Sequence, residues 1–408
     1  MPKLGNLGYA LIGKETTPGV AVTPTIALPL YDETLTTNTN LVDLNPIAGN
    51  KAARQGLAQG VRDHKGDLTL QAEPNTTALL LDSLLTKQST TNNGNGTYTH
   101  VFKLDTATDP HSYTVDIGMG NNLVARFVGL QLSKLAEEYN KTEGRWKGSA
   151  SALSSFYGRE VASISGTGTG PYTITFTTTY DPNPTNGLVV GDLITFMTSA
   201  TGVTNTAANG TVATIVNGTQ ITTTGVNLTT AAVGAGDICH LRVQTVTSAW
   251  LAPFLWTRLN YFVAATAAAA VTASATVTNQ TRFETGSVMA IEHKFEKDSG
   301  SDRSGGFDPA ALIRTLGDLT LKTKRIFDTP DQMKYYMSLV KTAFYIVHNA
   351  GPNYSLAVTV NNAIIKQGVK PQLKSDSILY SDIEYLVSQD ATDGQMFSVA
   401  VTNTLTTV

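Results

Sequence analysis

The sequence predicts a mainly β protein with two tandem β-sandwich units, each with one packed helix, and a small all-β domain inserted between them. The pentapeptide Gly-Asp-Leu-Thr-Leu occurs twice, at 66–70 and at 317–321. Each copy alternates Leu with Asp or Thr, the period of a β-strand, and is followed by a turn with a proline and an apolar, helix-like segment. Between the copies, residues 161–240 contain no Lys, Arg or Glu. A repeated strand-and-helix pattern with this compositional break indicates two copies of one unit around an insertion.

The composition agrees with short strands and turns and excludes several classes of protein. Of the 408 residues only 15% are charged, against about 25% in typical soluble domains. The net charge of −3 gives no bulk positive field to hold nucleic acid. Cys239 is the single cysteine, which excludes an intrachain disulfide and a zinc finger. Residues 1–5 lack the basic and apolar regions of a secretory signal, so we expect synthesis in a cytosol.

The first unit is predicted over residues 1–158. From Leu28 to Gln71 we expect a strand, a long loop and the strand of the first pentapeptide. The apolar run at 75–85 predicts a helix that packs on the sheet. Further strands are predicted at Tyr98–Leu104, Ser112–Ile117, Leu123–Leu132 and Arg145–Leu153.

The second unit is predicted over residues 244–408 with the same order of elements. Residues 288–295 alternate as a strand, and a loop precedes the second pentapeptide. Thr329 as N-cap, Pro330 at the first helical position and Gln332 form a capping box that starts a helix over 329–340. Four strands follow, at Ala343–Val347, Tyr354–Val360, Ile378–Leu386 and Met396–Thr404.

The insertion is predicted as a small all-β decoration domain over residues 159–243. Short alternating runs at 172–178, 193–197, 211–216 and 220–224 are separated by hairpin-type turns. Asn186-Gly187 and Asn217-Gly218 are two of these turns.

No set of residues predicts catalysis, so we expect a non-enzymatic protein without a cofactor or a metal. Neither a Gly-x-Ser-x-Gly turn nor a phosphate-binding loop is present. Cys239 and His240 are adjacent, and neighbouring residues on a strand point to opposite faces, so they are poorly placed to share a metal. A buried cysteine beside a surface histidine is the simpler expectation.

The opening of the chain carries a resemblance to a known family. Residues 12–25 read Ile-Gly-Lys-Glu-Thr-Thr-Pro-Gly-Val-Ala-Val-Thr-Pro-Thr, and the pattern continues through Gly56-Leu57 to the first pentapeptide and its helix. This stretch resembles the tail tube (major tail) proteins of long-tailed bacteriophages, over about residues 11–153 and 283–405. The segment Asn186–Ile194, followed by Asn209–Val212, is similar to a small β module of phage virion proteins, although that module usually starts with His where this chain has Asn186.

The resemblance implies a structural virion protein that assembles in the host cytoplasm and functions in the virion tail. In that family, sheets of neighbouring subunits join edge to edge around a lumen and the rings stack into a tube, the conduit for genome delivery. The implied partners are further copies of the chain, a tape-measure protein, and tail terminator and baseplate proteins, while DNA passes without specific binding. Two units in one chain predict trimeric rings with pseudo-sixfold symmetry; hexameric rings are the alternative.

The strands beside the long loops are candidates for the lumen wall, because a wall that carries carboxylates repels DNA phosphates. Lys294, Lys322 and Lys324 depart from an acidic lining. Either the wall is mixed in charge, or the strand register assumed for it is wrong by one residue. A solvated outer face is the alternative reading. The candidate lumen residues are Asp67, Thr69, Gln71, Glu73, Glu292, Glu296, Asp318 and Thr320.

The two long loops, Pro46–Lys65 and Asp298–Leu316, are predicted to pack against the next ring, with ordinary loop mobility as the alternative. The inserted domain is expected to decorate the outside of the tube and to contact surface glycans, with mere structural padding as the alternative. The candidate inter-ring residues are Lys51, Arg54, Arg62, Lys65, Asp302 and Arg303.

Two other functions remain open from the sequence. A baseplate or fibre adhesin built of β modules would bind host-surface glycans through aromatic-lined pockets. A polysaccharide-degrading enzyme of the virion would need paired carboxylates in a groove, and no such pair stands out.

Overall fold

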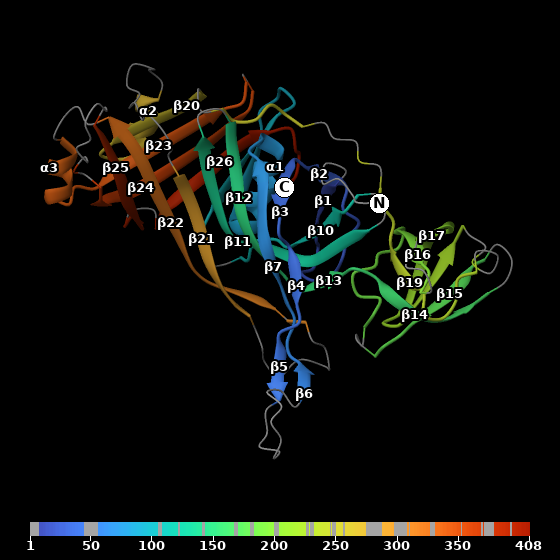
Figure 1. The fold of residues 1–408 in the computed structure, drawn as a ribbon. Helices are drawn as coiled ribbons and strands as arrows, with labels where there is room; N and C mark the ends of the chain where they lie inside the picture. The colour runs from blue at the N-terminus through green and yellow to red at the C-terminus, as the bar shows by residue number, and fades with distance from the viewer. Residues whose placement is uncertain are drawn as a thin grey trace, which may run out of the picture.

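The structure, a computed structural model, is mainly β, as predicted (Figure 1). Among the described residues, eighteen strands join in one branched sheet, six strands close into a separate barrel, and two form a hairpin. The described residues are 8–44, 56–104, 108–120, 123–140, 143–166, 170–179, 183–199, 204–225, 228, 232–244, 246, 250–255, 258–274, 288–297, 308–309, 311–326, 331–351, 353–368, 370, 379–391 and 394–408.

The first half of the chain contributes one long run of antiparallel strands. The pairing order is β1–β10–β11–β12–β7–β3, and the long strand β11 pairs with β10 near its start and with β12 further on. Strand β13 continues the ladder of β12 along the same edge of β11. The strands are β1 (Tyr9–Lys14), β2 (Ile26–Leu28), β3 (Leu30–Glu33), β4 (Thr36–Asn38), β7 (Asp63–Gln71), β8 (Thr86–Asn92), β9 (Tyr98–Lys103), β10 (Tyr113–Gly118), β11 (Val124–Asn140), β12 (Glu143–Ala152) and β13 (Ser154–Phe156).

The second half contributes another run, in the order β20–β23–β24–β25–β22–β21. At Ala363, strand β24 pairs with β23 on one edge and with β25 on the other. Residues 355–360 of β24 pair with β23 and with β26, so β26 lies on the same edge of β24 as β25. The strands are β20 (Leu259–Ala264), β21 (Val288–Lys297), β22 (Leu312–Ile326), β23 (Thr342–Asn349), β24 (Ser355–Gln367), β25 (Tyr380–Ser388) and β26 (Phe397–Asn403).

The two runs are joined by strand pairing and share one hydrophobic core. Strand β11 pairs with β21, and β9 pairs with β26, so each half completes part of the other's sheet. One cluster of buried side chains includes Leu70 and Trp146 from the first half and Leu321 and Tyr385 from the second. The strands predicted after the two pentapeptides are confirmed one by one, and β11 and β24 extend beyond their predicted ends. The predicted common order of the four strands is wrong, because β8 and β9 lie between α1 and β10, whereas β23 follows α3 directly and takes the place of β10 in the pairing order.

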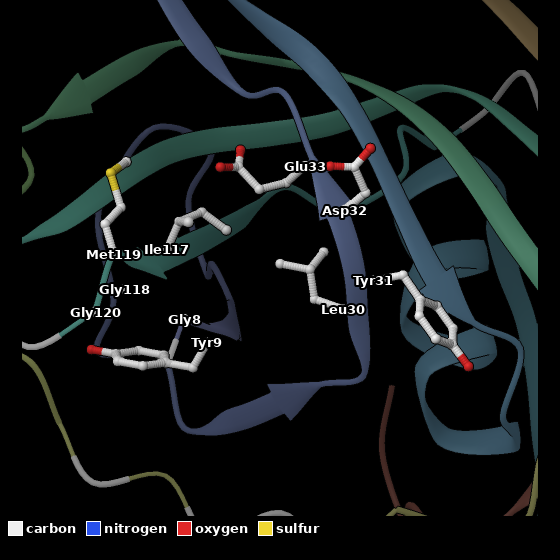
Figure 2. A pocket seen from close by; sticks show the side chains of 10 residues that line it. All are labelled: Gly8, Tyr9, Leu30, Tyr31, Asp32, Glu33, Ile117, Gly118, Met119 and Gly120. Carbon is white, nitrogen blue, oxygen red and sulfur yellow. The ribbon is translucent and has the colours of Figure 1, made fainter. Parts of the chain in front are cut away.

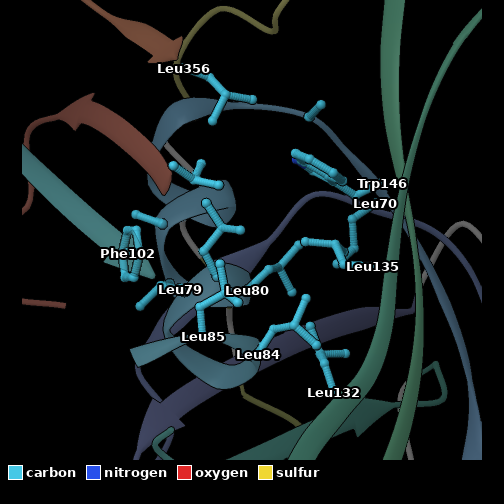
Figure 3. Packing of buried hydrophobic residues seen from close by; sticks show 14 of the residues in the cluster. Leu70, Leu79, Leu80, Leu84, Leu85, Phe102, Leu132, Leu135, Trp146 and Leu356 are labelled. Atoms are coloured by element: carbon cyan, nitrogen blue, oxygen red, sulfur yellow. The ribbon is translucent and has the colours of Figure 1, made fainter. Parts of the chain in front are cut away.

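Helix α1 (Pro74–Leu84) confirms the first predicted helix and fills the core. Its start is fixed by Glu73, whose carboxylate accepts hydrogen bonds from the backbone N–H groups of Asn75 and Thr76, with Pro74 at the first helical position. Figure 3 shows its leucines between Trp146 and Leu135 on one side and Phe102 on the other. The indole Nε1 of Trp146 donates to Thr77 Oγ1 at 2.7 Å, which satisfies a buried polar group.

Two further helices lie in the second half. Helix α3 (Asp331–Met337) confirms the second predicted helix but ends before residue 340, because the chain turns at Leu339, whose φ is +48°. The predicted cap residues Thr329 and Pro330 lie outside the described residues. Helix α2 (Ala267–Ala273), which the sequence did not predict, packs on β20 and β23.

The inserted residues form the closed barrel, which Figure 1 shows beside the sheet. Its interior is apolar, and Phe156 and Val124 of the sheet join the same cluster. The barrel order is β14–β15–β18–β17–β16–β19, with β14 (Arg159–Ser165), β15 (Tyr172–Phe176), β16 (Leu193–Met197), β17 (Thr204–Asn217), β18 (Gln220–Thr224) and β19 (Ile238–Leu241).

A buried ion network fixes the barrel to the sheet. Arg126 of β11 is fully buried and forms two-pronged hydrogen bonds to Asp116 of β10, at 2.6 and 2.8 Å, and to Asp192 at the start of β16, at 2.6 and 3.1 Å. It also donates to the carbonyl oxygen of Gly187 at 2.9 Å. Burial alone would lower the pKa of the guanidinium, but the two carboxylates raise it above its ordinary value, so the group stays charged.

Candidate assembly surface

The exposed face of the central sheet carries most of the predicted lumen residues. Residues opposite each other on paired strands share a face, and the register aligns Asp67, Ser149, Lys134, Glu292 and Asp318 in one row across five strands. Asp67 and Asp318 are exposed, whereas Leu68 and Leu319 beside them are buried. The predicted alternation is therefore confirmed at both pentapeptides.

A second row runs parallel to the first and crosses eight strands. In the order of the strands it contains Asp32, Thr69, Lys147, Ala136, Ala290, Thr320, Leu386 and Ile364. Thr69 and Thr320 are half-buried, and Gln71 lies two residues further along β7 on the same face. The structure thus places five of the candidate residues on one face of one sheet: Asp67, Thr69, Gln71, Asp318 and Thr320.

This face is mixed in charge rather than acidic. Lys147 and Arg145 of β12 are exposed opposite Thr69 and Gln71, and the guanidinium of Arg145 lies 4.3 Å from the centre of the Tyr31 ring. On the second half, Glu384 accepts a hydrogen bond from Lys366 at 2.7 Å and lies 3.6 Å from Lys322. Neighbouring charges of opposite sign leave little net field, because the two charges of a pair compensate each other and salt screens the remainder.

Three of the candidate lumen residues are placed differently or only by their backbone. The prediction for Glu73 is wrong: the residue is 2% exposed and caps α1, because the strand ends before it at Gln71 and the chain turns into the helix. Glu292 and Glu296 lie in β21, where the register puts Glu292 opposite Asp318 and Glu296 opposite Ile313.

The predicted inter-ring loop of the first half contains regular structure. A hairpin of β5 (Leu41–Leu44) and β6 (Gly56–Gln59) projects from the sheet (Figure 1), and β7 already begins at Asp63. Its apolar residues are exposed, with Leu41 60% and Leu57 56% accessible. The prediction of a structureless loop over 46–65 is therefore wrong for its last part, because paired strands satisfy the backbone there.

The charged residues of the two loops fall into two groups. Lys65 lies within β7, with its ammonium 2.7 Å from Asp63, so it belongs to the sheet and not to a loop. Arg62 lies just before β7, and its guanidinium is 3.8 Å from the carboxylate of Asp308. Lys51, Arg54, Asp302 and Arg303 lie outside the described residues. In the second predicted loop, residues 312–316 belong to β22.

Several strand edges of the sheet have no partner among the described pairings, and two of them lie at the two ends of the second row. One is the outer edge of β3, which pairs with β7. The other is the end of β24, where β23 stops at Ala363 while β24 continues to Gln367. A hollow of about 460 Å³ adjoins the first edge, and Figure 2 shows Leu30 of β3, Ile117 of β10 and Tyr9 of β1 around it. Unpaired edges of this kind favour pairing with another chain.

Exposed apolar side chains gather beside the second edge. Met337, the last residue of α3, is 82% accessible, and Leu339, just after the helix, is 65% accessible. Helix α3 packs on β24. Leu386 on β25, next to the end of β24, is 51% accessible. Several exposed apolar side chains close to a sheet edge are typical of a protein interface.

Two anchors of the N-terminal strand had no predicted contact: the half-buried Lys14 and the buried Glu15. Lys14 lies 3.0 Å from the buried Asp82 at the end of α1, and Glu15 accepts hydrogen bonds from Ser112, Thr114 and the backbone N–H of Gly129. The Gly-Lys-Glu opening therefore fixes the N-terminal strand to α1 and β10. A buried charge leaves no signal in the sequence until its partners are known.

Within the described part of the chain, no three His, Cys, Asp or Glu side chains gather where a metal ion would need them. Cys239 is buried, as predicted, but the surface position predicted for His240 is wrong, because β19 is covered on both faces and His240 is also buried. Burial lowers the pKa of His240.

Cys239 is expected to resist thiol reagents in the folded protein. Its side chain lies in the barrel core, and burial raises the pKa of the thiol well above its ordinary value, so little thiolate forms. Labelling with a maleimide should be more than about 100-fold slower in buffer than in guanidinium, since it requires the barrel to open. Equal rates in the two solutions would contradict the closed barrel.

Among the described residues no helix has the length and apolar character needed to cross a bilayer. No protein-family model matches the sequence, and no curated protein matches it.

Proposed function

We propose that this protein is a structural, self-assembling subunit of a phage tail tube, built from two tandem tail-tube-like β-sandwich units and an inserted decoration domain. The observation that supports the duplication most is the common pairing order. Strands β1, β10, β11, β12, β7 and β3 follow one another as β20, β23, β24, β25, β22 and β21 do, and the pentapeptide lies in β7 and β22 at the same place. One order repeated with one sequence motif favours a duplicated unit.

The open edges support assembly. A chain whose sheet ends in an unpaired strand on each side gains hydrogen bonds when copies associate head to tail, and a closed ring leaves no lateral edge. Two units in each chain give a pseudo-sixfold ring from three copies. The exposed face across both halves, which includes Asp67 and Asp318, then lines the lumen.

The mixed charge of this face suits a conduit. A strongly basic wall would hold DNA through its phosphates. Here Lys366 and Lys322 lie beside Glu384, and Lys134 stands in one row with Asp67 and Asp318, so the charges largely compensate. A compensated wall lets DNA and a tape-measure protein slide past without specific binding.

Negative-stain microscopy of the purified full chain at high concentration tests the proposal. We expect tubes of stacked rings, and native mass measurement of rings released from them should give three chains. Six chains in a ring would overturn the trimer but keep the tube. Compact particles that bind glycans, or that degrade a polysaccharide, would overturn the structural function in favour of an adhesin or an enzyme.

A further inference from the structure

We propose that the end of β24 in one copy pairs antiparallel with β3 of a second copy, with Ile364 opposite Asp32. This inference rests on the self-assembly proposed above and identifies the surfaces that meet. A junction of the same kind already exists within the chain, namely the pairing of β11 with β21.

The junction within the chain has a simple geometry. One edge of β11 is occupied by β12 and then β13, so β10 and β21 share the other edge. Strand β10 pairs with β11 up to Leu130, and β21 pairs with it from Lys134 to Glu138. The second half of the chain therefore continues the sheet where β10 stops.

Strand β24 offers the same edge, but nothing within the described pairings occupies it. Strand β25 holds one edge, and β23 pairs along the other until Ala363. Residues Ile364–Gln367 extend beyond β23 as Lys134–Glu138 extend beyond β10. The pentapeptides align Glu137 of β11 with Ile365 of β24. Leu70 pairs with Trp146, and Trp146 pairs with Glu137. In the same way, Leu321 pairs with Tyr385, and Tyr385 pairs with Ile365.

The occupant follows from the same alignment. Strand β21 pairs with β22 as β3 pairs with β7, so β3 is the counterpart of β21. Within the chain Ala136 is opposite Ala290, which is opposite Thr320. The counterparts of these residues are Ile364, Asp32 and Thr69. The second row described above begins at Asp32 and ends at Ile364. The proposed pairing therefore joins the Ile364 end of this row in one copy to the Asp32 end of the same row in the next copy.

The helices give an independent reason for a second copy at this edge. Counted from Pro74 and Pro330, Leu80 and Leu81 of α1 correspond to Tyr336 and Met337 of α3. Leu81 is fully buried in a helix that packs against β11 of the first half and β26 of the second. Met337 is 82% accessible and has no such cover. A chain placed beside β24 covers α3, and the hollow next to β3 gives room for its apolar side chains.

Disulfide cross-linking tests the register. In a Cys239→Ser background, Ile364→Cys combined with Asp32→Cys should form intermolecular disulfides in assembled tubes, since residues directly opposite in a sheet bring their Cβ atoms within bonding reach. A denaturing gel without reductant should then show a ladder that ends at the ring size. The matched control, Ile364→Cys with Glu33→Cys, places the thiols on opposite faces and should give no ladder.

Wild-type tubes provide a second readout that needs no substitution. Carbodiimide treatment of tubes assembled from mixed 15N-labelled and unlabelled chains should join Lys366 to Asp32 or Glu33 in mixed-isotope peptides. Tubes with neither the ladder nor these peptides would overturn the β24–β3 pairing and leave the tube function intact. Wild-type protein that stays monomeric would overturn both.

Discussion

Replacing Arg126 with methionine is expected to lower the free energy of unfolding by about 3 to 5 kcal/mol, because removing one partner leaves buried charges uncompensated. Arg126 is the only cation that the structure shows on both Asp116 and Asp192 among the described contacts, and these carboxylates are 1% exposed. The loss should appear in chemical denaturation followed by circular dichroism. The barrel should also detach from the sheet first, which faster thiol labelling of Cys239 would report.

Two further variants separate lost charge compensation from lost packing. Arg258 is exposed, so Arg258→Met should change the free energy of unfolding by less than about 0.5 kcal/mol. Adding Asp116→Asn and Asp192→Asn to Arg126→Met should recover part of the loss, because no buried charge then remains. A loss below about 1 kcal/mol for Arg126→Met would contradict the buried network.

Leu81→Ala and Met337→Ala are expected to have opposite consequences although the two residues lie at the same distance along the chain from Pro74 and Pro330. Leu81 is fully buried between the two halves, and its truncation should cost about 2 to 5 kcal/mol of unfolding free energy through lost contacts and a cavity. Met337→Ala should change the stability of the isolated chain by less than about 0.5 kcal/mol, because the side chain is exposed.

For tube formation, in contrast to stability, we expect the larger effect from Met337→Ala. The folded fraction of Leu81→Ala should still form tubes, whereas Met337→Ala should raise the critical concentration for tube formation, measured by pelleting. Val216→Ala is the control for an exposed apolar residue away from α3, on β17 of the barrel and at 52% accessibility, and should leave that concentration unchanged. Equal assembly by Met337→Ala and the wild type would show that a partner does not cover α3.

Local periodicity predicted the elements well where both the pattern and the surroundings were simple. At 66–70 and 317–321, alternating leucines correctly placed one face in the core, because a strand with one buried face has a fixed period of two. The helix at α1 was predictable from its apolar run. Glu73 was misplaced because the same alternation runs through it, and only the N–H groups of the helix show that its carboxylate is a cap.

Long-range contacts were not predictable in the same way. Residues 41–59 have few strand signals, yet β5 and β6 pair with each other, since pairing depends on a partner strand more than on intrinsic preference. His240 was expected at the surface because a strand usually has one wet face, but in β19 both faces are covered. Lys14, Glu15 and Arg126 gained roles only when folding brought their partners to them from distant positions.

The sequence by itself determined the mainly β class, the helix after the first pentapeptide, the short strands of the barrel and the faces of the pentapeptide strands, since these follow from local spacing of side chains. The tertiary structure decided that β11 joins β21, that α1 is covered while α3 is exposed, and where the sheet ends. The reason is physical: a residue's neighbours along the chain fix its face, but backbone hydrogen bonds between distant strands fix which edges are satisfied and which remain open.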